Sequence, residues 1–170
     1  MLYSIGRGCP ELETSFSAGQ GVGPESGTDA SASDAGADPY IRNMKKNFDN
    51  WNKRKKEIND EQPNFYRARD IRWCSLGINI GFEQDGTSEL YRRPVLVIKG
   101  FSRHVCLVVP LTTSTKENPY HLSVGMVADR EAFAILSQIR LIDTKRLHDP
   151  LGILDQKKFE KIRKAIRDLI

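Results

Sequence analysis

The chain has 170 residues, of which 26 are basic and 22 acidic, for a formal net charge of +4. This length suits one folded domain with a modest core plus a tail. The longest apolar run, residues 105–111, is too short to cross a bilayer, and the N-terminus lacks the apolar segment of a signal peptide. The three cysteines form neither a CxxC motif nor a Cys/His cluster, so we expect a reduced, cytoplasmic protein without a zinc site or membrane partner.

The charge is unevenly distributed along the chain. Residues 1–38 hold one Arg and six acidic residues, whereas residues 39–170 hold 25 basic and 16 acidic residues, a net charge of +9. A basic folded part fits a polyanionic partner, although solubility alone explains many basic surfaces. Residues 1–38 are rich in Gly, Ser, Ala, Asp and Thr and cannot bury enough apolar surface to fold, so we predict a disordered tail.

Residues 40–62 predict an amphipathic helix that ends before Pro63. Apolar side chains recur there at three-and-four spacing, at Ile41, Met44, Phe48, Trp51 and Ile58. Basic side chains cover its other faces. Two interpretations are open: a helix packed on the domain with a solvated basic side, or a helix that docks RNA or a protein partner.

Several short strands are expected next, at residues 70–78, 93–99, 105–113, 120–127 and 134–142. The link from Gly100 to Arg103 is short enough for a hairpin. A C-terminal helix follows Asp155, which can cap it, with an apolar stripe at Phe159, Ile162, Ala165, Ile166 and Leu169. This order predicts an α+β, mainly β fold: a small twisted antiparallel sheet or SH3-like barrel with a C-terminal helix and an extra N-terminal helix.

A glycine-rich polar loop, residues 81–86, lies between two apolar runs that hold it in place. Around it, the chain shows the pattern Trp73-x-x-Leu76, Gly81-x-Glu83-Gln84-x-Gly86 and Arg93-Pro94-Val95-Leu96-Val97. This pattern resembles the signature of the MazF/PemK toxin family. The runs VPLTT at 109–113 and LSQIRLID at 136–143 are similar to that family's third and late strands. The resemblance covers residues 65–170.

The resemblance implies a barrel-like fold, shared with the gyrase poisons of the CcdB family, and a toxin of a type II toxin–antitoxin pair. The implied activity is that of an mRNA interferase, a metal-independent endoribonuclease that needs no cofactor. The 2′-OH of single-stranded RNA attacks the adjacent phosphorus and leaves a 2′,3′-cyclic phosphate and a 5′-OH. Implied partners are mRNA, a second copy in a homodimer, a cognate antitoxin on the RNA surface, and operator DNA through the antitoxin complex.

Three residues are expected to be catalytic. Arg93 precedes a proline, which restricts it to extended backbone, and its guanidinium can grip a phosphate through two hydrogen bonds, although it could instead pair with Glu83 or Asp85. The resemblance places Thr112 at the family's catalytic threonine, where its hydroxyl suits positioning better than proton abstraction. Glu83 could accept a proton, orient Arg93 or bond the loop backbone.

RNA contacts are expected at Phe82, Gln84, Thr113, His121 and Gln138. Phe82 offers a ring on which a base can stack, a contact that tolerates any sequence. Ser137 stands where some relatives have an acidic residue, so no proton relay through that carboxylate is expected here. No spacing brings two of the three histidines together, which disfavours a catalytic histidine pair.

Two alternative functions are open. The same fold could serve a gyrase-inhibiting toxin, but such a protein would not require both Arg93 and Thr112. It could also serve a non-catalytic RNA-binding or regulatory relative, which Ser137, Phe82 and the added N-terminal region favour. RNA cleavage without topoisomerase would distinguish the endoribonuclease from both.

Overall fold

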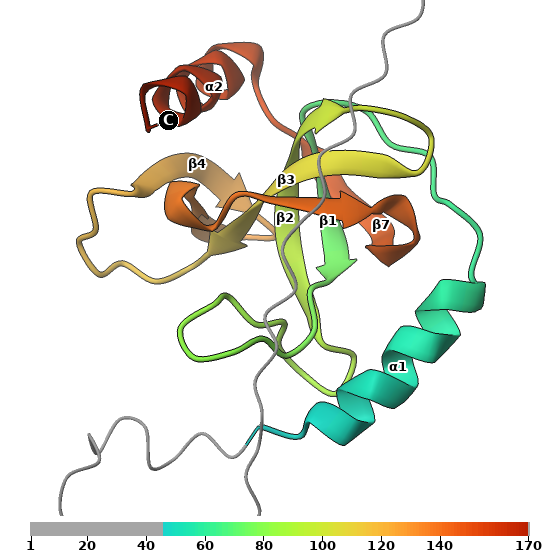
Figure 1. Ribbon diagram of the computed structural model, residues 1–170. Helices are drawn as coiled ribbons and strands as arrows, with labels where there is room; N and C mark the ends of the chain where they lie inside the picture. Colours follow the sequence, from blue (N-terminus) through green and yellow to red (C-terminus); the bar gives the residue numbers. More distant parts are fainter. Residues whose placement is uncertain (1–45, 170) are drawn as a thin grey trace, which may run out of the picture. The chain divides into compact units, whose positions relative to one another are not determined.

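The computed structural model describes residues 46–169, so the predicted tail at 1–38 lies outside the described residues. The elements are α1 (Phe48–Asp60), β1 (Asp70–Ser75), β2 (Arg92–Gly100), β3 (Val105–Thr112), β4 (His121–Val127), β5 (Arg130–Ile135), β6 (Arg140–Asp143), β7 (Leu147–Ile153) and α2 (Gln156–Leu169). Figure 1 shows the strands between the two helices. The mainly β architecture with a helix at each end is therefore confirmed. No helix among residues 46–169 is long and apolar enough to cross a membrane.

The strands form one curled antiparallel sheet in the order β4-β5-β3-β2-β1-β7, and β6 also pairs with β3. The predicted hairpin around Gly100 is confirmed, because β2 and β3 pair with Val95 opposite Pro110 and Gly100 opposite Cys106. Strand β3 is thus the centre of the sheet, with β2 on one edge and β5 and β6 on the other.

Strand β2 is buried on both faces, which explains its unbroken apolar run. Val95 and Val97 belong to one core cluster, whereas Leu96 and Ile98 belong to the other. Successive side chains of a strand point to opposite faces, so a strand covered on both sides needs apolar residues throughout. The buried thiols of Cys74 and Cys106 lie in the first cluster.

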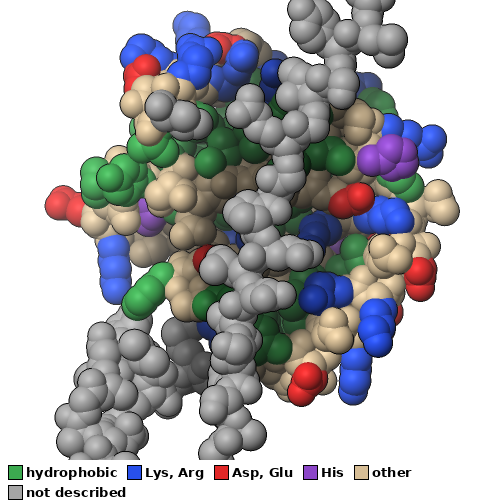
Figure 2. All heavy atoms as spheres, in the orientation of Figure 1, with side chains coloured by type: hydrophobic (Ala, Val, Ile, Leu, Met, Phe, Trp, Pro, Cys, Tyr) green, Lys and Arg blue, Asp and Glu red, His purple; other side chains and the backbone are tan. Residues whose placement is uncertain are grey.

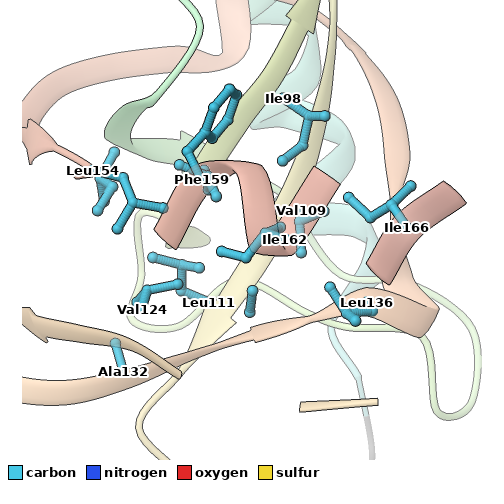
Figure 3. Close-up of a cluster of buried hydrophobic side chains, with 13 residues drawn as sticks. Ile98, Val109, Leu111, Val124, Ala132, Leu136, Leu154, Phe159, Ile162 and Ile166 are labelled. Atoms are coloured by element: carbon cyan, nitrogen blue, oxygen red, sulfur yellow. The ribbon is translucent and has the colours of Figure 1, made fainter. Parts of the chain in front are cut away.

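Helix α2 covers the second cluster (Figure 3). Its Phe159, Ile162 and Ile166 are buried there, as the predicted stripe requires. Burial of one such side chain contributes about 1.5–3 kcal/mol. The predicted cap is confirmed, since the Asp155 carboxylate accepts hydrogen bonds from the main-chain N–H groups of Lys157 and Lys158 at 2.9 and 3.2 Å.

The prediction of a continuous strand at 134–142 was wrong. Thr112 of β3 pairs with Phe133, and Val108 of β3 pairs with Arg140. These partners are four residues apart along β3 but seven residues apart from Phe133 to Arg140. The segment opposite β3 therefore has three residues more than a continuous strand would need, and the 3₁₀ turn Leu136–Gln138 accommodates them. The turn buries Leu136 in the core, which offsets the interruption of the ladder.

Two further differences concern α1 and β7. The helix predicted at 40–62 begins at Phe48 in the described residues, because the Asn47 side chain accepts a hydrogen bond from the main-chain N–H of Asn50 and caps it. The first part of the prediction, residues 40–45, lies outside the described residues. Strand β7 was not predicted, since it contains Pro150 and Gly152; an edge strand tolerates both.

Candidate active site

Arg93 and Thr112 line the same cavity, which has a volume of about 660 Å³. Arg93 is the second residue of β2 and Thr112 the last of β3. Because Val95 pairs with Pro110, continuing the antiparallel register by two residues puts Arg93 opposite Thr112. The two residues that the resemblance marks as catalytic are thus brought together by the β2–β3 hairpin.

Main-chain carbonyl groups fix the Arg93 side chain. Its Nε donates to the oxygen of Asp85 at 2.6 Å, and its Nη1 donates to the oxygen of Leu111 at 3.1 Å. Within residues 46–169, neither the Glu83 nor the Asp85 carboxylate forms an ion pair with it. Burial lowers the pKa of Arg93 from its ordinary value and the Asp85 charge opposes this shift, but a guanidinium keeps its charge at neutral pH.

Thr112 offers its hydroxyl at the same cavity. Its Oγ1 accepts a hydrogen bond from the main-chain N–H of Ser114 at 3.1 Å, which leaves the hydroxyl hydrogen free to donate. Thr113 and Ser114 also line the cavity, so three consecutive hydroxyl-bearing residues form part of its wall. Such a wall suits the oxygen atoms of a phosphate.

The side chain of Gln138 holds the glycine-rich loop through two hydrogen bonds. The side-chain oxygen of Gln138 accepts from the main-chain N–H of Gln84 at 3.2 Å, and its amide nitrogen donates to the oxygen of Phe82 at 3.4 Å. Gly86 is required because a Cβ there would lie 1.8 Å from the Tyr91 oxygen. Both ends of the Gln138 amide therefore bond the loop in this structure.

Three residues expected on the loop do not line the cavity. Phe82 and Glu83 are exposed, with 79% of the Phe82 surface accessible, and Gln84 is half-buried. His121 lines a neighbouring cavity of about 600 Å³, and Ser114 belongs to both cavities. The Nδ1 atom of His121 is buried without a hydrogen-bond partner among the described residues.

The sequence reasoning did not predict several residues that line the cavity, and Arg130 is the charged one among them. Arg130 is the first residue of β5, directly after the turn that joins it to β4. It reaches the cavity because β5 pairs with the end of β3, with Thr112 opposite Phe133. The short turn between β4 and β5 could have been recognised in the sequence. It does not indicate, however, that β5 pairs with β3 on its other side. Arg130 adds a second cation at the cavity.

The family model described as "PemK-like, MazF-like toxin of type II toxin-antitoxin system" matches residues 67–170. The chain belongs to this family. The match includes every residue that lines the Arg93 cavity. It excludes α1, which precedes it in the chain.

Similar proteins carry the same family name or activity. Endoribonuclease EndoA of Bacillus subtilis (strain 168) is 30% identical over 108 residues, which cover 58% of this chain and 88% of that protein. The Form-I crystal structure of MazF from Deinococcus radiodurans has a TM-score of 0.49 at 18% identity, covering 64% of this chain and 97% of that one. An endoribonuclease in complex with its cognate antitoxin, from mycobacterial species, has a TM-score of 0.48 at 18% identity, covering 61% and 93%.

Proposed function

We propose that this toxin is an endoribonuclease that cleaves single-stranded RNA without a metal ion. The observation that supports the proposal most strongly is the pairing of Arg93 with Thr112 at one cavity, with the guanidinium held by two main-chain carbonyls. The family membership and the 30% identity to an endoribonuclease point to the same chemistry.

The proposed reaction is an in-line transfer within the RNA. The oxygen of the 2′-OH forms a bond to the adjacent phosphorus, the bond from phosphorus to the 5′-oxygen breaks, and the products are a 2′,3′-cyclic phosphate and a 5′-OH. One proton leaves the 2′-OH and one is added to the 5′-oxygen. Negative charge grows on the phosphate oxygens during the step, so fixed donors aimed at them lower the barrier.

Arg93 has the donors for this role. A guanidinium has five N–H groups, and the two carbonyl contacts occupy one on Nε and one on Nη1. The remaining three N–H groups are available to a phosphate. Because the two carbonyls already fix the direction of the guanidinium, less entropy is lost on reaching the transition state. Thr112 would position a phosphate oxygen or the 2′-OH.

Proton transfer is assigned to Glu83. No carboxylate or imidazole is among the described residues that line the Arg93 cavity. Glu83 is exposed and lies two residues from Asp85, whose carbonyl holds Arg93, which supports this assignment. Phe82, Gln84, Thr113, His121 and Gln138 are proposed to contact the RNA on either side of the cut.

The net charge of +9 over residues 39–170 supports an RNA substrate and an acidic antitoxin partner. Figure 2 shows Lys and Arg side chains along the upper and right-hand edges of one face. We propose a homodimer whose RNA surface is also covered by an acidic segment of the cognate antitoxin, through complementary charge. Operator DNA would be bound through the antitoxin complex.

The test is cleavage of a mixed-sequence single-stranded RNA by the purified protein in EDTA, without topoisomerase. Wild type should produce cyclic-phosphate ends, and Arg93→Ala should lower the rate by about 10²-fold or more. Arg103→Ala is the matched control, because Arg103 is exposed at the far end of the β2–β3 hairpin. RNA binding without cleavage by wild type would contradict the proposal and favour a non-catalytic relative.

A further inference from the structure

Lys46 connects the segment before α1 to the glycine-rich loop. Its ammonium group donates to the main-chain oxygens of Asn79 and Gly81 at 2.7 and 3.0 Å, and it pairs with the Asp85 carboxylate at 2.8 Å. These contacts use all three of its N–H donors. The side chains of Lys46 and Asp85 are only 11% and 25% exposed, so the pair is shielded from solvent more than an ordinary surface ion pair.

Trp51, in the first turn of α1, packs against Gly77, which precedes the glycine-rich loop. Its side chain is 5% exposed, and a Cβ at Gly77 would lie 2.1 Å from its indole ring. Gly77 has a φ of +86°, so both its backbone and its lack of a side chain are needed there. The indole also packs on Tyr91 at 5.4 Å between ring centroids and beneath the Arg146 guanidinium at 5.6 Å.

Asp85 transmits these contacts to Arg93. One carboxylate oxygen of Asp85 binds Lys46, and the other accepts the main-chain N–H of Asn79 at 2.6 Å. The main-chain oxygen of the same residue accepts the Arg93 Nε at 2.6 Å. The direction of that carbonyl, and with it the direction of the guanidinium, therefore depends on how the Asp85 side chain is held.

We propose that Lys46 and Trp51 are positioning residues for the cleavage reaction and hold residues 77–86 in the conformation that aims Arg93 into its cavity. The inference rests on the proposed function. It also assigns a role to a segment that lies outside the region matched by the family model, residues 67–170. A misplacement of about 1 Å at a reacting group can cost about 10²-fold in rate, so a clamp on the loop has a large effect.

The test compares Lys46→Met, Lys46→Arg and Lys53→Met in the full-length protein. Lys46→Met keeps an unbranched side chain only one atom shorter but removes the charge and all three donors. Lys53 lies on α1 and is exposed, and its side chain forms no ion pair or hydrogen bond within residues 46–169, so Lys53→Met is the matched control. The measured quantities are kcat and KM for RNA cleavage and the rate of amide hydrogen exchange in residues 77–86.

Lys46→Met should lower kcat by about 10²-fold, change KM much less, and accelerate exchange in the loop but not in β3. Lys46→Arg should recover part of kcat, and Lys53→Met should match wild type. Unchanged loop exchange in Lys46→Met would overturn the inference, whether or not kcat falls. If wild type does not cleave RNA, the proposed function fails, while faster loop exchange in Lys46→Met would still support the clamp.

Discussion

The Nε of Arg93 donates to the main-chain oxygen of Asp85 at 2.6 Å, and this contact joins the end of the glycine-rich loop to the cavity wall. The same Asp85 binds Lys46 through its carboxylate. Arg93 is therefore linked to two parts of the chain that are far apart in sequence, the glycine-rich loop directly and Lys46 through Asp85.

Arg93→Lys tests the need for the planar guanidinium. A lysine keeps the charge but cannot donate to the Asp85 and Leu111 oxygens and to a phosphate in the same fork geometry. We expect the single-turnover cleavage rate to fall by about 10²-fold, with a smaller loss of RNA affinity because the charge remains. A lysine variant that cleaves at the wild-type rate would show that Arg93 acts only through its charge.

Thr112→Val tests the hydroxyl at the cavity. Valine has nearly the same shape, so the pairing of this residue with Phe133 should persist and the melting temperature should change little. We expect kcat/KM to fall by about 10²-fold, whereas Thr112→Ser should retain most activity. Thr115→Val, on the exposed segment that follows, serves as the control. Equal activity of Thr112→Val and wild type would remove the hydroxyl from the mechanism.

His148 predicts a pH dependence of stability. Its Nε2 lies 2.7 Å from the Ser75 hydroxyl. Burial lowers the pKa of His148 from the ordinary 6.5, and the positive charge of Arg92 lowers it further. The smaller influences come from three further charged groups, namely Glu61, Arg54 and Asp149. The folded state thus favours the neutral imidazole, while the unfolded chain takes up a proton as the pH falls through 6.5.

The free energy of unfolding should therefore decrease as the pH falls below about 6.5. His148→Gln removes the titrating group but keeps a polar side chain beside Ser75, so the variant should lose less stability between pH 7.5 and 5.5 than wild type does. Urea denaturation midpoints at the two pH values measure this. The same decrease in both proteins would assign the pH dependence to other groups.

Ile162→Ala tests the packing of α2 on the sheet. The Ile162 side chain is fully buried among the strands (Figure 3). Its truncation should lower the free energy of unfolding by about 2–5 kcal/mol, through lost burial and a residual cavity. The neighbouring Lys161 is exposed, and Lys161→Ala should change stability by less than about 0.5 kcal/mol. A loss below about 1 kcal/mol for Ile162→Ala would indicate that α2 is loosely attached.

The sequence predicted the parts of the fold that local pattern determines. The apolar run at 95–98, the hairpin at Gly100 and the Asp155 cap each depend on residues close in sequence, and all three are confirmed. The turn at Leu136–Gln138 was missed because it compensates for a register difference along β3, which no local pattern shows.

Part of the geometry of the candidate site was also predictable. The register of β2 and β3 explains why Arg93 and Thr112, found from the motif, lie at one cavity. The contribution of Lys46 was not predictable, since it depends on a contact with Asp85, 39 residues later. Arg130 likewise reaches the cavity only through the pairing of β5 with β3.

The most direct test of the proposed chemistry compares two RNA substrates that differ in one atom. One is the all-ribose RNA cut by wild type, and the other carries a single 2′-deoxy nucleotide on the 5′ side of the cleaved bond. We predict that wild type cleaves the first in EDTA and leaves that bond of the second intact, because the attacking oxygen is missing. Cleavage of both at similar rates would show that the nucleophile is not the neighbouring 2′-OH and would contradict the role assigned to the Arg93 and Thr112 site.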